Sequence, residues 1–216
     1  MSALNFRSDA RQDQFASIVI GDKIGGFYID IGSHHSERSN NTYYFSKLGW
    51  RGICIEIDRT HEPSYYSRSG CNLIIGDATK VSYKEMLEAS SAPLSLDYMS
   101  LDVDIASLEV LRIFPFDSFR PKIITIEHDA YIYGDEYRAP QRKILEQSGY
   151  MLLASNVFVE QSGYEDKECP FEDWWVEKEF LGNSAFRNTR FESKLPSSIL
   201  ECLKNLHNGK DKITIC

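Results

Sequence analysis

No apolar run in this chain approaches the roughly 18 residues that suggest a membrane-spanning helix. The chain also lacks an N-terminal segment with the basic, apolar and small-residue order of a secretory signal peptide. Its five cysteines are scattered, odd in number and form no C-x-x-C pair, which favours free thiols in a reducing compartment. Together these absences predict a soluble, cytoplasmic protein.

Basic residues are outnumbered: 24 Lys and Arg stand against 32 Asp and Glu, which gives a net charge of −8 and a sequence pI near 5.2. Broad binding to a phosphate backbone needs a basic face, so we expect no nucleic-acid partner, although a local basic pocket is compatible with this balance. The hydrophobic content of 42% is ordinary for a globular protein. A chain of 216 residues favours a single domain over 1–216.

Apolar runs alternate with helix-like segments along most of the chain. Strands are predicted over 27–31, 53–57, 72–75, 97–103, 122–127 and 150–159. Helices are predicted over about 7–20, 39–48, 63–69, 82–90, 106–113 and 136–148. Because the strands are continuously apolar, the pattern predicts an α/β fold with a mostly parallel sheet covered on both faces. The part from about 160 to 216 is irregular, with a surface loop over 160–173, a short strand over 171–176 and an amphipathic helix over 197–206.

The most informative stretch is 26–58, which reads strand, glycine turn, helix and strand. Its first strand ends at Asp30 and Gly32, and its second strand carries Glu56, 24 residues after Gly32. This is the layout of a nucleotide-binding βαβ unit, in which a late carboxylate accepts hydrogen bonds from a ribose diol. Asp77 follows the third strand, where it can accept from an adenine amine or serve as a turn or helix-cap residue.

Acidic residues are concentrated after the fourth and fifth predicted strands, at Asp102, Asp104, Glu127 and Asp129, together with His128. The carboxyl ends of parallel strands meet at the edge that holds the ligand crevice, so we expect these side chains to converge. Oxygen ligands with a histidine suit Mg²⁺ or Mn²⁺. Without a metal, His128 is a candidate general base, because an imidazole titrates near neutral pH. A polar strand edge with Asp104 as a helix cap is the structural alternative.

Five segments, in this order, resemble those of the FkbM-type methyltransferases, which belong to the class I S-adenosylmethionine-dependent superfamily. They read FYIDIGSHHSERSNNTYYFSKLGWRGICIEID, YMSLDVDIASLEVL, PKIITIEHD, RKILEQSGYMLLASNV and FEDWW, within roughly residues 17–180. An ordered set of segments is more specific than any one glycine motif. The resemblance implies a Rossmann-like class I methyltransferase fold, with a mostly parallel seven-stranded sheet whose last strand is reversed.

The resemblance also implies that S-adenosylmethionine lies over Gly32 and that its methyl group passes to a hydroxyl of a small-molecule or glycan acceptor. The residues implied for donor binding are Asp30, Gly32, Ser33, Glu56, Ile57, Asp77, Ala78 and Asp102. From their own chemistry and position, the candidate catalytic residues are His128, Asp102 and Glu127. Some related O-methyltransferases hold Mg²⁺ with acids after strands four and five, so the same three side chains are the candidate metal ligands.

One loop departs from the usual D-x-G-A-N-x-G pattern, because His34 stands in the Asn position and Ser36 in the second Gly position. Losing that glycine restricts close approach of the backbone to a ligand, which leaves a non-catalytic or degenerate nucleoside-binding module as an alternative. A dinucleotide-dependent oxidoreductase is disfavoured, because the turn at Gly32 does not supply G-x-G-x-x-G. No feature of the sequence specifies an oligomeric state.

Overall fold

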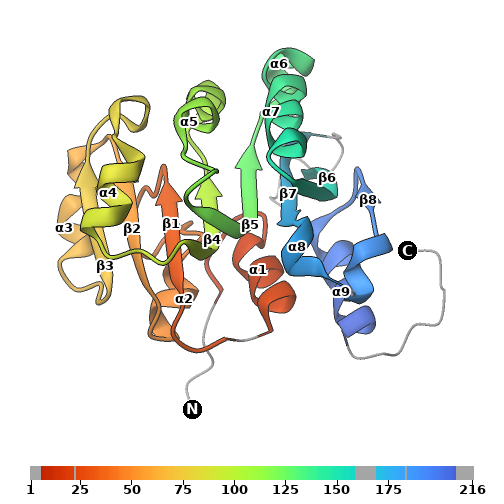
Figure 1. Ribbon diagram of the computed structural model, residues 1–216, viewed down its shortest axis with the longest axis horizontal. Coiled ribbons are helices and arrows are strands. Elements are labelled where there is room, and N and C mark those ends of the chain that lie inside the picture. Colours follow the sequence, from red (N-terminus) through yellow and green to blue (C-terminus); the bar gives the residue numbers. More distant parts are fainter. Residues whose placement is uncertain (1–5, 22, 159–168, 183, 208–216) are drawn as a thin grey trace.

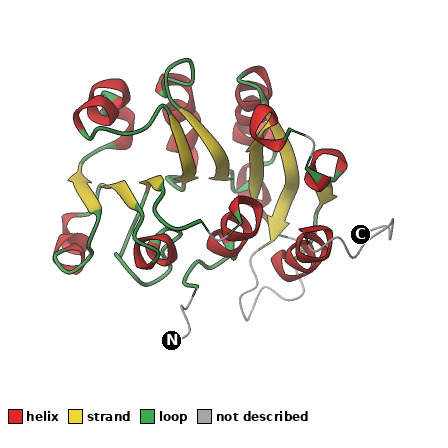
Figure 2. Cartoon of the chain, turned by 60° about the horizontal axis from the view of Figure 1, so that its bottom comes forward, coloured by secondary structure: helices red, strands yellow, loops and turns green. Residues whose placement is uncertain are grey.

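The computed structural model describes residues 6–21, 23–158, 169–182 and 184–207. In these residues an eight-stranded sheet has the order β3-β2-β1-β4-β5-β7-β6-β8, and helices cover both of its faces (Figures 1 and 2). The strands are β1 (Phe27–Ile31), β2 (Arg51–Glu56), β3 (Cys71–Ile75), β4 (Ser95–Leu101), β5 (Arg120–Glu127), β6 (Tyr150–Phe158), β7 (Pro170–Glu177) and β8 (Phe191–Glu192). The α-helices are α1 (Gln12–Ile20), α2 (Tyr43–Lys47), α3 (Glu62–Tyr65), α4 (Tyr83–Ala89), α5 (Ser107–Ile113), α6 (Ala130–Tyr133), α7 (Asp135–Gln147), α8 (Lys178–Leu181) and α9 (Pro196–His207). The 3₁₀ helices are η1 (Arg59–His61), η2 (Ala78–Lys80), η3 (Asp104–Ala106) and η4 (Ala185–Asn188).

The sheet is parallel from β3 through β5, whereas β7 runs antiparallel to both β5 and β6. The predicted α/β class and the mostly parallel sheet with a reversed last strand are confirmed. The structure adds β8, which pairs in parallel with β6 through Ala154 and Ser155. A two-residue strand has no alternation to recognise, so the sequence predicts seven strands where the described residues form eight.

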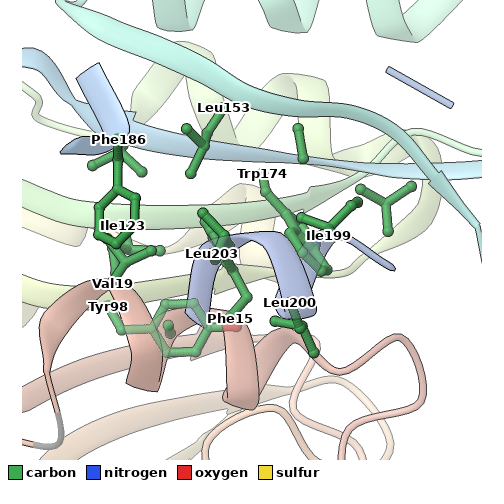
Figure 3. Close-up of a cluster of buried hydrophobic side chains, with 14 of the residues drawn as sticks. Phe15, Val19, Tyr98, Ile123, Leu153, Trp174, Phe186, Ile199, Leu200 and Leu203 are labelled. Atoms are coloured by element: carbon green, nitrogen blue, oxygen red, sulfur yellow. The ribbon is translucent and has the colours of Figure 1, made fainter. Parts of the chain in front are cut away.

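Two apolar clusters, one on each face of the sheet, hold the layers together. The first joins α1, α2, α3 and α9 to the sheet, and the second joins α4, α5 and α7 to the opposite face. Adjacent Trp174 and Trp175 of β7 point to opposite faces and so belong to different clusters. Figure 3 shows Phe15 of α1 and Leu203 of α9 beside Trp174, and the Phe15 and Trp174 rings stack with centroids 4.4 Å apart. Burial of each such side chain stabilises the fold by about 2 kcal/mol.

Helices are shorter than predicted where polar side chains bind elsewhere. The predicted helix over 39–48 is reduced to α2, because Asn40 and Thr42 before it turn inward and bind the buried Asp30. The predicted helix over 63–69 is reduced to α3.

The N- and C-terminal parts agree with the sequence in outline. α1 occupies the second half of the predicted helix over 7–20, and β7 and α9 contain the predicted strand over 171–176 and helix over 197–206. Residues 159–168, which include most of the predicted loop over 160–173, lie outside the described residues. In the part of the chain that the structure describes, none of the helices combines the length and apolar character needed to span a bilayer.

Candidate functional site

A cavity of about 540 Å³ opens at the carboxyl-terminal edge of the sheet. It is lined by Gly32 after β1, Glu56 at the end of β2, Asp77 after β3 and Asp102 after β4. The chain passes from β1 outward to β3 and then returns to β4 on the other side of β1. The cavity therefore lies at the topological switch point, where open α/β sheets bind ligands. Its volume falls in the usual range of small-molecule sites, about 300–1,000 Å³.

The backbone conformation and the packing around position 32 both require a glycine there. Its φ is +84°, and a Cβ atom there would lie 1.7 Å from the backbone carbonyl oxygen of Asp102. The N–H of Asp102 donates to the carbonyl of Ile31 at 2.8 Å, so the ends of β1 and β4 approach too closely for a side chain. The sequence analysis explains Gly32 by the close approach of a ligand to the backbone. The structure adds a second reason, which is the close packing of β1 against β4.

Asp30 and Ser33, two of the predicted donor-binding residues, are buried and do not line the cavity. The Oδ2 atom of Asp30 accepts a hydrogen bond from the hydroxyl of Thr42 at 2.6 Å, and burial raises the pKa of Asp30 to about 6. The Oγ atom of Ser33 accepts from the hydroxyl of Tyr65 at 2.8 Å. Both side chains therefore fix the loop after β1 from within the protein.

Arg68 holds the same loop, although no sequence pattern identifies it as a functional residue. Its guanidinium is buried and donates to the Ser36 carbonyl and to Asn40 Oδ1, each at 3.0 Å. It also donates to the hydroxyl groups of Thr42, at 2.7 Å, and Tyr28, at 3.1 Å. One arginine in a weak helical pattern gives no sequence signal, because its partners are gathered only by the tertiary fold.

The two unusual residues of this loop are accommodated by local contacts. His34 has a left-handed backbone with a φ of +46°, and its ring packs against His61 with centroids 4.0 Å apart. The N–H of Ser36 donates to Ser64 Oγ at 3.0 Å, and Ser36 Oγ donates to the Ser64 carbonyl at 2.6 Å. His34 also lines the cavity, so the loop places a histidine where the D-x-G-A-N-x-G pattern has an asparagine.

Glu56 is oriented by the backbone around it. Its Oε2 atom accepts from the N–H of His34 at 2.6 Å, and its Oε1 atom accepts from the N–H of Asp58 at 2.8 Å. A carboxylate has about four lone-pair sites, so each oxygen can still accept a bond from a ligand. Glu56 therefore faces the cavity in a fixed orientation that suits a ribose diol.

Ile57, Asp77 and Ala78 line the part of the cavity next to Glu56. The hydroxyl and the backbone N–H of Thr79 both donate to Asp77 Oδ1, at 2.7 and 2.9 Å, and these bonds lower the pKa of Asp77. Asp77 is therefore an ionised acceptor in a cavity that the apolar residues Ile57 and Ala78 also line. This arrangement suits a flat heterocycle that carries an amine.

Asp102 and Glu127 form a carboxyl pair. Asp102 lines the cavity, whereas Glu127 is 8% exposed and does not line it. The two groups hydrogen-bond to each other, and burial together with this bond raises the pKa of Glu127 to about 12. Burial also raises the pKa of Asp102. At neutral pH the pair holds one proton on Glu127, which donates to the Asp102 carboxylate.

A second acidic group adjoins the pair. Asp104, Glu127 and Asp129 each place one oxygen within 4.8 Å of the others. This set differs from the predicted metal ligands Asp102, Glu127 and His128. Asp104 and Asp129 have left-handed backbones, with φ of +48° and +46°, and sequence spacing gives no indication of such turns.

His128 faces the interior rather than the cavity. Its Nδ1 atom accepts from the N–H of Ala130 at 3.1 Å, and its Nε2 atom lies 3.4 Å from Asp173 Oδ1. Arg142 donates to both oxygens of Asp173, at 2.7 and 2.9 Å. The imidazole thus belongs to a buried network between α7 and β7 and does not line the cavity.

Comparison with models of protein families finds no match, and comparison with curated proteins finds none either. Among solved structures, the chain is similar to a TehB-like S-adenosylmethionine-dependent methyltransferase from Corynebacterium glutamicum, with 12% identity, 77% of this chain and 88% of that chain covered, and a TM-score of 0.50. It is also similar to a proposed rRNA methylase from Clostridium thermocellum, with 13% identity, 80% and 97% covered, and a TM-score of 0.51. A proposed O-methyltransferase from Klebsiella pneumoniae matches with 15% identity, 82% and 84% covered, and a TM-score of 0.51.

Identities of this size bear on the fold and not on the substrate. None of these three neighbours is described as an FkbM-type protein, so the resemblance to that family rests on the sequence segments. The sheet order, the two helical layers and these neighbours lead to one conclusion. The protein has the Rossmann-like fold of class I S-adenosylmethionine-dependent methyltransferases.

Proposed function

We propose that this protein is an S-adenosylmethionine-dependent methyltransferase of the FkbM type that methylates a hydroxyl of a small-molecule or glycan acceptor. The observation that carries the proposal is the cavity at the switch point, lined in strand order by Gly32, Glu56, Asp77 and Asp102. Each of these residues has the chemistry that its predicted role requires, and a glycine and three unrelated acids have no reason to share one cavity in that order.

The residues present fit the donor. Glu56 would hold the ribose diol, and Asp77 with Ala78 would hold the adenine. The donor, when bound, supplies an electrophilic methyl group next to a cationic sulfur. Asp102 lines the cavity, and its carboxylate form would favour a positive charge there.

The acceptor hydroxyl must lose a proton, and three residues are candidates for the base. His128 is engaged by Ala130 and Asp173 and does not line the cavity. Asp102 lines it, and Glu127 hydrogen-bonds to Asp102. We therefore assign the base to the Asp102–Glu127 pair, with Asp102 as the group that meets the acceptor.

The sequence predicts Asp102, Glu127 and His128 as ligands of Mg²⁺. These three side chains do not gather around one point, because His128 Nε2 faces Asp173. The proposed reaction accordingly depends on the position of the acceptor next to Asp102 and includes no step that uses a metal.

Calorimetric titration with S-adenosylhomocysteine tests the proposal. We expect micromolar affinity in the original protein and a loss of at least about tenfold in Glu56→Ala. Glu88→Ala, which removes an exposed carboxylate on α4, is the matched control and should bind normally. Transfer of a labelled methyl group to an acceptor pool then tests the activity. Absence of binding in the original protein, or equal binding by both variants, would contradict the assignment of the cavity.

A further inference from the structure

Two cysteines of neighbouring parallel strands lie side by side. Cys54 is in β2 and Cys71 begins β3, and their Sγ atoms hydrogen-bond at 2.7 Å. The strand register pairs Cys71 with Gly52, two residues before Cys54, so both cysteines point to the same face of the sheet. A disulfide bond is about 2.05 Å long, so the two sulfur atoms need to approach by only about 0.7 Å to form one.

Cys71 has the surroundings of a reactive thiol. It accepts a hydrogen bond from the hydroxyl of Tyr28, which in turn accepts one from Arg68 at 3.1 Å. The hydrogen bond with Cys54, the charge of Arg68 and the bond from Tyr28 together lower the pKa of Cys71, against the opposing effect of burial. A lowered pKa increases the fraction of thiolate, which is the form that attacks an oxidant.

The two cysteines differ in exposure. Cys71 is partly exposed, whereas Cys54 is fully buried, and this burial raises the pKa of Cys54. An oxidant therefore meets Cys71 first, and Cys54 is held next to it as the second thiol. A partly exposed thiol of lowered pKa beside a second cysteine is the arrangement of redox-sensitive pairs. Neither cysteine lines the proposed donor cavity.

We propose that Cys54 and Cys71 form a redox modification site, which a peroxide converts into a reversible disulfide. The Cys71 thiolate attacks one oxygen of hydrogen peroxide, which breaks the O–O bond, forms a sulfenic acid and releases hydroxide. The sulfur of Cys54 then attacks the sulfur of Cys71, so that the S–S bond forms, the S–O bond breaks and a second hydroxide leaves. The two hydroxides take up the two thiol protons, so two thiols are oxidised and one peroxide is reduced to two waters.

The disulfide closes a segment that supports the cavity. Cys54 and Cys71 are 17 residues apart, and between them lie Glu56, which lines the cavity, and Arg68, which holds the loop after β1. Closing this segment restrains the unfolded chain, so the oxidised protein should unfold at a higher urea concentration than the reduced protein. The inference does not depend on the proposed methyl transfer, because neither thiol takes part in that reaction.

Oxidation followed by peptide mass spectrometry tests the proposal. Reduced protein is treated with hydrogen peroxide, the remaining thiols are blocked with iodoacetamide, and the protein is digested with trypsin without reductant. Cleavage after lysine and arginine gives peptides 52–59 and 69–80, each of which contains one of the two cysteines. We expect these peptides to be joined and to separate with dithiothreitol. The bond should form at least about tenfold faster in the native protein than in concentrated urea, because the fold holds the thiols together.

Three variants identify the role of each thiol. Cys71→Ser removes the attacking thiol and should abolish the joined peptides, whereas Cys202→Ser, at a partly exposed cysteine of α9, is the matched control and should keep them. Cys54→Ser leaves Cys71 without a second thiol, so its sulfenic acid should accumulate and react with dimedone. Absence of the joined peptides in the oxidised original protein, or equal rates of their formation in native and urea-unfolded protein, overturns the proposal. Bonding of Cys71 mainly to a different cysteine overturns it as well.

Discussion

Arg68 offers the sharpest test of how the loop after β1 is supported. Replacing Arg68 by Leu removes four hydrogen bonds, to Ser36, Asn40, Tyr28 and Thr42. At about 1 kcal/mol for each bond, with about 1 kcal/mol recovered from the added apolar contact, the free energy of unfolding should fall by about 3 kcal/mol. That is the size expected when one partner of a buried charged network is removed.

The assay is urea unfolding followed by circular dichroism, with calorimetry of S-adenosylhomocysteine binding on the same samples. Arg59→Leu is the control, because the Arg59 side chain is 73% exposed and forms a surface ion pair with Glu62, so its loss should cost about 0.5 kcal/mol. Arg68→Leu should also weaken S-adenosylhomocysteine binding by about tenfold, since the loop that carries His34 loses its support. Arg68→Leu and Arg59→Leu proteins of equal stability would refute the reasoning.

Three further outcomes are expected. Gly32→Ala should cost about 3 kcal/mol in urea unfolding because its Cβ meets the Asp102 carbonyl, whereas Gly25→Ala, with a φ of +66° and open space around it, should cost about 1 kcal/mol; equal costs would contradict the packing argument. Burial raises the pKa of Glu172 to about 8, so the folded state holds this proton more tightly than the unfolded chain, and stability should fall as pH rises from about 5 through 8. Glu172→Gln should flatten that part of the stability curve, and parallel curves for the two proteins would argue against it. His128→Gln should lower stability but leave S-adenosylhomocysteine affinity and methyl transfer intact, and a loss of transfer in the folded variant would restore His128 as the base.

The fold follows from patterns that the sequence displays directly. Continuous apolar runs such as Ile123 to Ile126 fit strands covered on both faces, and their alternation with helices specifies a parallel sheet. Parallel strands end at one edge, so Glu56, Asp77 and Asp102 can be placed together from their positions alone. Most of the acidic residues that line the cavity can therefore be predicted from the positions at which the strands end.

The sequence does not predict the direction in which a side chain points at the end of a strand. Asp102 and His128 both follow apolar strands, yet Asp102 lines the cavity and His128 turns toward Asp173, which lies on the neighbouring strand β7. Asp104 and Asp129 join Glu127 through left-handed backbone turns that non-glycine residues seldom adopt. These side-chain orientations depend on residues that are distant in the sequence, so no local sequence pattern predicts them.

The same sheet stabilises its acids in three different ways, and the difference explains why a site exists at all. Asp97 is balanced by Lys23 and Lys122, which leaves it no capacity for a ligand. Glu56 is held by backbone N–H groups, which orient it without cancelling its charge. Glu127 keeps a proton and supports Asp102. A row of oriented but unbalanced carboxylates favours cations, and the sulfonium centre of the donor that we propose meets that requirement.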